Sequence, residues 1–87
     1  MSQTTGVCAV VEVLARALTD RPDEVRVKAS EHKGTTVVEL FVGPGEIGRV
    51  IGKQGRTAAA LRTLAVSAGE KEGKVVTLEI RDTPYKG

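Results

Sequence analysis

The sequence predicts a single α+β domain in which three helices pack on one face of a three-stranded sheet. Apolar residues recur at helical spacing in three segments and alternate with polar residues in three others. Each alternating segment has only one apolar side, so the other face of the sheet should meet water. The 87 residues suffice for one small domain, and the segments follow the order helix, strand, strand, helix, helix, strand.

The first helix is expected from Val7 to Leu18. Apolar residues repeat there three and four positions apart, at Val7, Val10, Val11, Leu14, Ala17 and Leu18. It should end near Pro22, because proline cannot continue a helix. Cys8, the single cysteine, lies close to the apolar side of this helix. A single cysteine excludes an internal disulfide and fits a reducing cytoplasm. We interpret Cys8 as a core residue, with a reactive thiol as the alternative.

Three strands are indicated by an alternation of period two. A loop at residues 31–34, Glu-His-Lys-Gly, should join the first two strands, and the third follows the last two helices. The inward-facing residues are expected to be Val25, Val27 and Ala29, then Val38, Leu40 and Val42, and finally Val76, Leu78 and Ile80.

A turn with two glycines separates the last two predicted helices. Gly52 and Gly55 flank Lys53 and Gln54. Glycine permits positive φ and lets a ligand approach the backbone closely. The amides of residues 54–56 would then lie at the start of the next helix, where unpaired N–H groups and the positive end of the helix dipole attract phosphate. The turn therefore predicts an anion-binding loop.

The glycine spacing is weak on its own, and its context carries the argument. Ten glycines in the chain make roughly one such pair by chance, and Gly45 and Gly48 form a second pair. Apolar faces border the turn, with Ile47, Val50 and Ile51 before it and Ala58, Leu61, Leu64, Ala65 and Ala68 after it. An ordinary surface turn between two helices is the alternative.

Positive charge is concentrated around the same turn. The segment from Ile47 to Gly69 holds four basic residues, Arg49, Lys53, Arg56 and Arg62, and no acidic residue. The rest of the chain holds nine basic and eleven acidic residues, so the formal charge of +2 comes from this segment. Such a patch suits a polyanion such as nucleic acid, whereas a solvated basic helix face is the alternative.

Other functional classes fit the sequence less well. Residues 43–48 match Gly-x-Gly-x-x-Gly, but the preceding strand carries Glu39 where a doubly wound sheet requires burial on both faces. Arg49 and Val50 stand where a P-loop requires Lys and then Ser or Thr. One histidine, one cysteine and no recognisable catalytic carboxylate pair leave little for an active site or a metal centre. We therefore expect no enzyme activity and no cofactor.

One run of the sequence resembles a known family: Pro-Gly-Glu-Ile-Gly-Arg-Val-Ile-Gly-Lys-Gln-Gly-Arg-Thr-Ala-Ala-Ala-Leu-Arg-Thr-Leu, at residues 44–64. Its Ile-Gly-Lys-Gln-Gly core, in this order of elements, looks like a type II KH domain of the small single-domain bacterial KH proteins, the KhpA family. The resemblance spans about residues 7–82, between tails at residues 1–6 and 83–87. It implies an α-β-β-α-α-β fold whose Gly-x-x-Gly loop holds the backbone of about four unpaired nucleotides.

The resemblance also assigns roles to residues. Gly52 and Gly55 would be the loop glycines, Lys53 and Gln54 would face phosphate, and Ile51 would pack beneath the loop. Arg49, Arg56 and Arg62 would flank the RNA backbone. Ile47 and the second strand could supply apolar contacts to bases. His32 and Lys33 are candidates for the opposite rim, although a loop histidine is more often without function.

The same resemblance implies partners and a cellular role. The family points to single-stranded RNA as the ligand and to a homodimer or a heteromer with a larger KH-containing protein of the KhpB type. It implies an RNA chaperone or post-transcriptional regulator linked to cell shape and envelope growth. The alternative is a KH-fold protein-interaction module that does not bind RNA. No apolar run approaches the length of a membrane helix and no signal peptide is recognisable, so we expect a cytoplasmic protein without a membrane partner.

Overall fold

The computed structural model describes residues 6–82. Residues 1–5 and 83–87 of the predicted tails lie outside this range, whereas Gly6, predicted in the first tail, begins a helix. The elements are α1 (Gly6–Leu18), a 3₁₀ turn η1 (Pro22–Glu24), β1 (Arg26–His32), β2 (Thr35–Val42), α2 (Ile47–Ile51), a 3₁₀ turn η2 (Lys53–Gly55), α3 (Arg56–Lys71) and β3 (Val75–Asp82). This is the predicted α-β-β-α-α-β order, and it is consistent with a type II KH fold. The start of α1 differs from its prediction by one residue.

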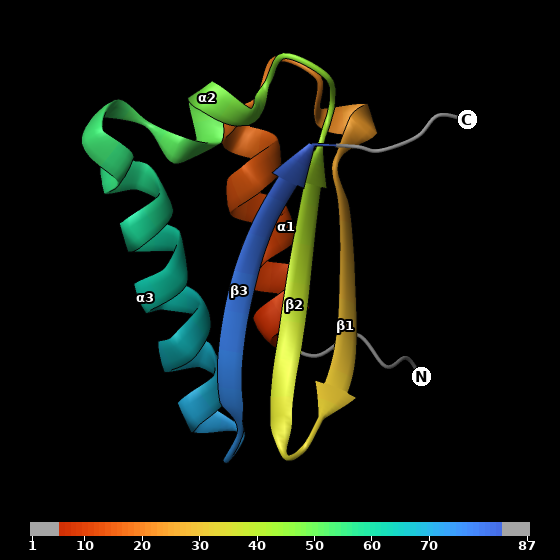
Figure 1. Ribbon diagram of the computed structural model, residues 1–87, viewed down its shortest axis with the longest axis vertical. Helices are drawn as coiled ribbons and strands as arrows, with labels where there is room; N and C mark the ends of the chain where they lie inside the picture. Colours follow the sequence, from red (N-terminus) through yellow and green to blue (C-terminus); the bar gives the residue numbers. More distant parts are fainter. Residues whose placement is uncertain (1–5, 83–87) are drawn as a thin grey trace.

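The sheet has the order β1-β2-β3, with β1 antiparallel and β3 parallel to the central strand β2. In Figure 1, α1 lies behind the sheet and α3 runs beside β3, while α2 sits at the end of the sheet where β2 finishes. The parallel pair requires a crossover between β2 and β3, and α2, η2 and α3 form it. The glycine turn is therefore part of that crossover.

The core lies between the helices and the inner face of the sheet. Every second residue of β2 is buried, and Val38, Leu40 and Val42 are fully enclosed. Residues from α1, α2, α3 and β3 complete the cluster, namely Val7, Val11, Ala15, Val50, Leu61, Ala65, Val76 and Leu78. The inward positions predicted for the second and third strands are confirmed, with Ile80 partly buried. Cys8 is buried, as expected for a core residue.

The first strand differs from its prediction in two ways. The hairpin loop contains only Lys33 and Gly34, whose φ angles are 52° and 83°. Two residues with positive φ form the tight turn that matches the twist of paired strands, so pairing continues through His32. The predicted inward position of Ala29 is wrong: the edge strand β1 packs against the core through Val27, and Ala29 is exposed.

Gly69 allows the end of α3 to approach the start of β3. A Cβ atom at this position would overlap Cγ2 of Val76 and lie 3.2 Å from the carbonyl oxygen of Lys74. The amide of Lys74 donates to the carbonyl of Gly69 at 2.8 Å, which closes the connection between helix and strand. The helix and the strand are therefore in contact through a glycine that has no room for a side chain.

We predict that Gly69→Ala destabilises the protein, although alanine favours a helix by up to about 1 kcal/mol. Overpacking a core costs about 1–3 kcal/mol, and this loss should exceed the helix gain. Gly48→Ala in α2 is the matched control, because a Cβ there meets no atom within 4 Å. Urea unfolding should show a lower midpoint for the first variant and an equal or higher midpoint for the second. An unchanged midpoint for Gly69→Ala would contradict the packing described.

Candidate nucleic-acid interface

The turn between α2 and α3 has a backbone that glycine makes possible. Gly52 (φ 77°, ψ 175°), Gln54 (φ 55°, ψ 25°) and Gly55 (φ 73°, ψ 13°) all have positive φ, and only Lys53 between them does not. Residues other than glycine rarely adopt such angles, although Gln54 does so here. The two glycines of the motif are therefore required by the backbone, as the sequence predicted.

The two glycines have different surroundings. A Cβ at Gly52 would overlap the hydroxyl oxygen of Thr57 and lie 3.1 Å from its backbone nitrogen. A Cβ at Gly55 would meet no atom within 4 Å. Gly52 thus packs against the first turn of α3, whereas Gly55 leaves an open surface that a ligand can approach.

The predicted set of unpaired amides at residues 54–56 is partly wrong. The Gly55 amide donates to the carbonyl oxygen of Gly52 at 3.2 Å, and the Arg56 amide donates to the carbonyl oxygen of Lys53. The glycine turn is a 3₁₀ turn, and both of these amides are hydrogen-bonded to carbonyl oxygens within it. Positive charge for a ligand must therefore come largely from side chains.

The structure gathers only some of the predicted site residues at the turn. Lys53 and Gln54 are exposed on its surface, and Arg56 donates from Nη2 to Oε1 of Gln54 at 3.2 Å. Arg62 is exposed on α3, six residues after Arg56, and thus on another side of the helix. Arg49 on α2 is held by two carboxylates, described below. Lys53, Gln54 and Arg56 therefore form the compact part of the site.

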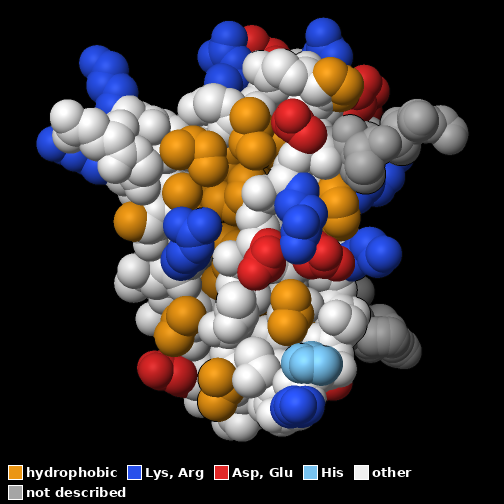
Figure 2. All heavy atoms as spheres, in the orientation of Figure 1, with side chains coloured by type: hydrophobic (Ala, Val, Ile, Leu, Met, Phe, Trp, Pro, Cys, Tyr) orange, Lys and Arg blue, Asp and Glu red, His pale blue; other side chains and the backbone are white. Residues whose placement is uncertain are grey.

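Apolar side chains border the basic turn. Figure 2 shows hydrophobic side chains gathered between the region of α2 and the upper part of β3, with Lys and Arg side chains projecting at the upper left rim. Ile47 and Ile51 on α2 and Ile80 on β3 are partly buried apolar residues of these elements. This arrangement could pair phosphate contacts at the rim with apolar contacts to bases.

His32 and Lys33 lie far from the glycine turn. They stand at the β1–β2 hairpin, at the end of the sheet opposite α2 (Figure 1). β2 spans eight residues between these ends, or roughly 23 Å at the usual rise of a strand. The structure therefore does not bring these two residues together with the loop.

A polar cluster that the sequence did not predict ties α2 to the end of α1. Oε1 of Glu46 accepts hydrogen bonds from the Thr19 hydroxyl at 2.6 Å and from the Asp20 amide at 2.8 Å. Arg49 pairs with Oδ2 of Asp20 at 2.9 Å and lies 3.6 Å from Oε1 of Glu46. The Thr19 hydroxyl holds the pKa of Glu46 below its usual value, helped by the Asp20 amide and the charge of Arg49, while burial opposes them.

Glu46 also argues against a dinucleotide at Gly43–Gly48. Its carboxylate stands at the start of α2, where a pyrophosphate would need positive potential, and α2 has only five residues. No spacing rule connects Thr19 with Glu46, 27 positions apart, so sequence patterns carry no signal for this contact.

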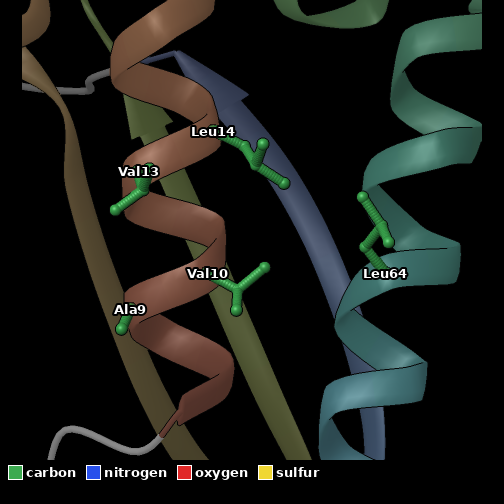
Figure 3. Close-up of a pocket in the computed structure, with 5 residues that line it drawn as sticks. All are labelled: Ala9, Val10, Val13, Leu14 and Leu64. Carbon is green, nitrogen blue, oxygen red and sulfur yellow. The ribbon is translucent and has the colours of Figure 1, made fainter.

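A second surface feature is an apolar groove between α1 and α3. Ala9, Val10, Val13 and Leu14 of α1 and Leu64 of α3 line it. In Figure 3, Val10 and Leu14 point across the gap toward Leu64, while Ala9 and Val13 lie on the outer side of α1. Leu64, on the apolar face predicted after the turn, faces this groove and is 47% exposed. We call these five residues the α1–α3 groove.

Within residues 6–82, no helix is both long and apolar enough to cross a membrane. The same residues contain no cluster of three or more His, Cys, Asp or Glu side chains that could hold a metal ion.

Comparison with known proteins identifies relatives over most of the chain. The family model described as KhpA/KhpB, KH domain, matches residues 9–80. An RNA-binding protein KhpA of Aquifex aeolicus is 54% identical over 71 residues, which cover 82% of this chain and 90% of that protein. Its counterpart in Halalkalibacterium halodurans is 47% identical over 73 residues, or 84% and 96% of the two chains.

Solved structures share the fold at low sequence identity. The chain superposes on Era in complex with MgGDPNP and nucleotides 1506-1542 of 16S ribosomal RNA, with a TM-score of 0.65 at 24% identity. A variant of Aquifex aeolicus Era bound to GDP.AlF4- gives 0.62 at 19% identity. The matches cover 90% and 97% of this chain but only 30% and 33% of the Era chains.

The lowered pKa of Glu46 predicts how one part of the stability depends on pH. A carboxyl whose pKa is lower in the folded state stabilises the fold above its unfolded pKa, about 4.5, and this contribution is lost as the pH falls through the folded value. Wild type should therefore exceed Glu46→Gln in urea midpoint near pH 7, and the difference should shrink below pH 4.5. A difference that stays constant from pH 7 to pH 3 would contradict this role.

Proposed function

This chain belongs to the KhpA/KhpB KH-domain family, and from that membership we propose that it binds single-stranded RNA through the turn from Gly52 to Gly55. The observation that carries the proposal is the turn itself, a glycine-dependent backbone that presents Lys53 and Gln54 to solvent beside an apolar surface. The relatives named RNA-binding protein support the choice of ligand.

RNA would be held by its backbone and by a few apolar contacts to bases. The open side of Gly55 lets a phosphate approach the turn, and Lys53 and Arg56 supply positive charge there. Ile47, Ile51 and Ile80 would meet bases in the adjoining apolar surface. KH domains are expected to bind about four unpaired nucleotides in this way.

The alternative, a protein-interaction module without RNA binding, has less support at the turn. Acidic residues there would repel phosphate, whereas Lys53 and Gln54 do not. An RNA chaperone or post-transcriptional role, a link to cell shape and envelope growth, and a cytoplasmic location remain predictions from the resemblance.

Preference for single strands provides the first test. We predict tighter binding to a short unpaired RNA than to a perfect duplex, because a groove bordered by one glycine turn follows a single backbone. If two or three phosphates are neutralised, log K against log salt should have a slope of about −1.4 to −2.1. Fluorescence anisotropy at several salt concentrations measures both. Equal affinity for the duplex, or a constant independent of salt, would rule out this mode of binding.

Charge reversal at the turn tests the site directly. Lys53→Asp with Gln54→Asp should weaken RNA binding more than tenfold, or more than about 1.4 kcal/mol. Both side chains are exposed, so stability should change by about 0.5 kcal/mol or less.

The matched control for this pair is Ser30→Asp with Lys33→Asp, which changes the charge equally at the far end of the sheet. It should keep most of the affinity. Unchanged binding by a folded Lys53→Asp, Gln54→Asp variant would place the phosphate contacts elsewhere.

We further propose that the chain pairs with a second copy of itself or with a larger KH-containing protein of the KhpB type. The α1–α3 groove is the surface we assign to this contact, since Val13 is 66% exposed and Leu64 is 47% exposed on an otherwise apolar face (Figure 3). Two linked units would each hold a few nucleotides and gain avidity from the raised effective concentration.

Self-association should depend on the α1–α3 groove. We predict that wild type forms dimers at high protein concentration and that Val13→Lys shifts it to monomer, because a charged amine would have to be desolvated in the contact. Val75→Lys is the control, as Val75 is equally exposed, at 66%, but lies on β3. Light scattering reports the mass of each. A strict monomer for wild type, with no RNA-binding protein co-purifying from cells, would overturn the proposal.

A further inference from the structure

The short helix α2 packs on the core through Val50 and the partly buried Ile47. It contains five residues, and Val50 is its only fully buried one. Yet the glycine turn begins immediately after it, and the Gly52 amide donates to the carbonyl oxygen of Gly48 at 2.9 Å. Any displacement of α2 therefore moves the turn that the proposed function assigns to RNA.

Polar contacts also fix α2 relative to the end of α1. Thr19 and Glu46 are 7% and 8% exposed, and their side chains are joined at 2.6 Å between the end of α1 and the start of α2. The amide of Asp20 donates to the same carboxylate oxygen. On the outer side, the guanidinium of Arg49 connects the last turn of α2 to Oδ2 of Asp20. Both ends of α2 are thus tied to the same short segment after α1.

We propose that Thr19, Asp20, Glu46 and Arg49 are positioning residues that hold α2, and through it the turn from Gly52 to Gly55, in the geometry that binds RNA. This inference rests on the proposed function. It revises the role predicted for Arg49, which acts through the position of the turn and is not a phosphate contact. The carboxylate pairs of Arg49 already use the charge that a phosphate would need.

Asp20→Asn separates the two roles of Arg49 by the sign of its effect. Asp20 is exposed, at 67% of its side chain, so the variant should fold. Loss of an acidic charge and release of Arg49 would strengthen RNA binding if Arg49 met phosphate. If Arg49 positions α2, affinity should instead fall by about two- to fivefold, the range expected for an exposed ion pair. Glu12→Gln, which breaks the exposed pair with Arg16 on α1 and changes the charge equally, should leave affinity unchanged.

Two further variants test the mechanism. Thr19→Val removes the hydroxyl donor without altering charge, and it should weaken binding at an unchanged salt slope. Arg49→Gln should likewise keep the salt slope, whereas loss of a phosphate contact would reduce its magnitude by about 0.7. If Thr19→Val does not fold, Asp20→Asn and Arg49→Gln decide the question.

Amide NMR signals of the turn provide a readout that needs no RNA. In Asp20→Asn, the amide shifts of residues 52–55 should move, while those in Glu12→Gln should not. Unmoved turn signals, or equal or tighter RNA binding by Asp20→Asn, would overturn the positioning role. If wild type itself does not bind RNA, the proposed function fails, and the NMR signals still decide whether this cluster positions the turn.

Discussion

Burial of one side of β2 is the constraint on which the rest of the structure depends. Val38, Leu40 and Val42 are fully enclosed, and β2 pairs with both of the other strands that the structure describes. A shift of register by one residue would turn these side chains to solvent, so the register of both neighbours is set by the core. The parallel partner β3 then requires a crossover, and the crossover carries the glycine turn to the edge of the sheet.

The glycine turn itself is determined by backbone sterics more than by charge. Gly52 has no space for a side chain beside Thr57, and Gly55 adopts the left-handed conformation. The turn satisfies amides of its own, so its geometry does not depend on a bound anion. A turn that is formed without a ligand would let the proposed RNA contact hold the nucleic-acid backbone without reading its sequence, since phosphates are the same at every position.

The molecule presents two separate surfaces. The basic turn and its apolar border lie where α2 joins the start of α3, whereas the α1–α3 groove lies between the two long helices (Figures 2 and 3). A partner in the groove would leave the turn accessible. Such a separation would suit the proposed function, because linked copies that each contact few nucleotides could bind one RNA together.

The sequence by itself determined the element order, the one-sided strands and the glycine turn, because each is a local pattern of period or backbone conformation. It did not determine which basic side chains are available to a phosphate. Arg49 is predicted from the sequence as a phosphate contact, but the fold places Asp20 and Glu46 beside it. Leu64 followed the apolar period of its helix, yet its side chain lies in the α1–α3 groove, across from Val10 and Leu14, and is 47% exposed. Ala29 follows the period of its strand, yet it lies on the edge strand β1 and is exposed. Contacts between residues distant in sequence depend on how the elements pack, and only the tertiary structure decides them.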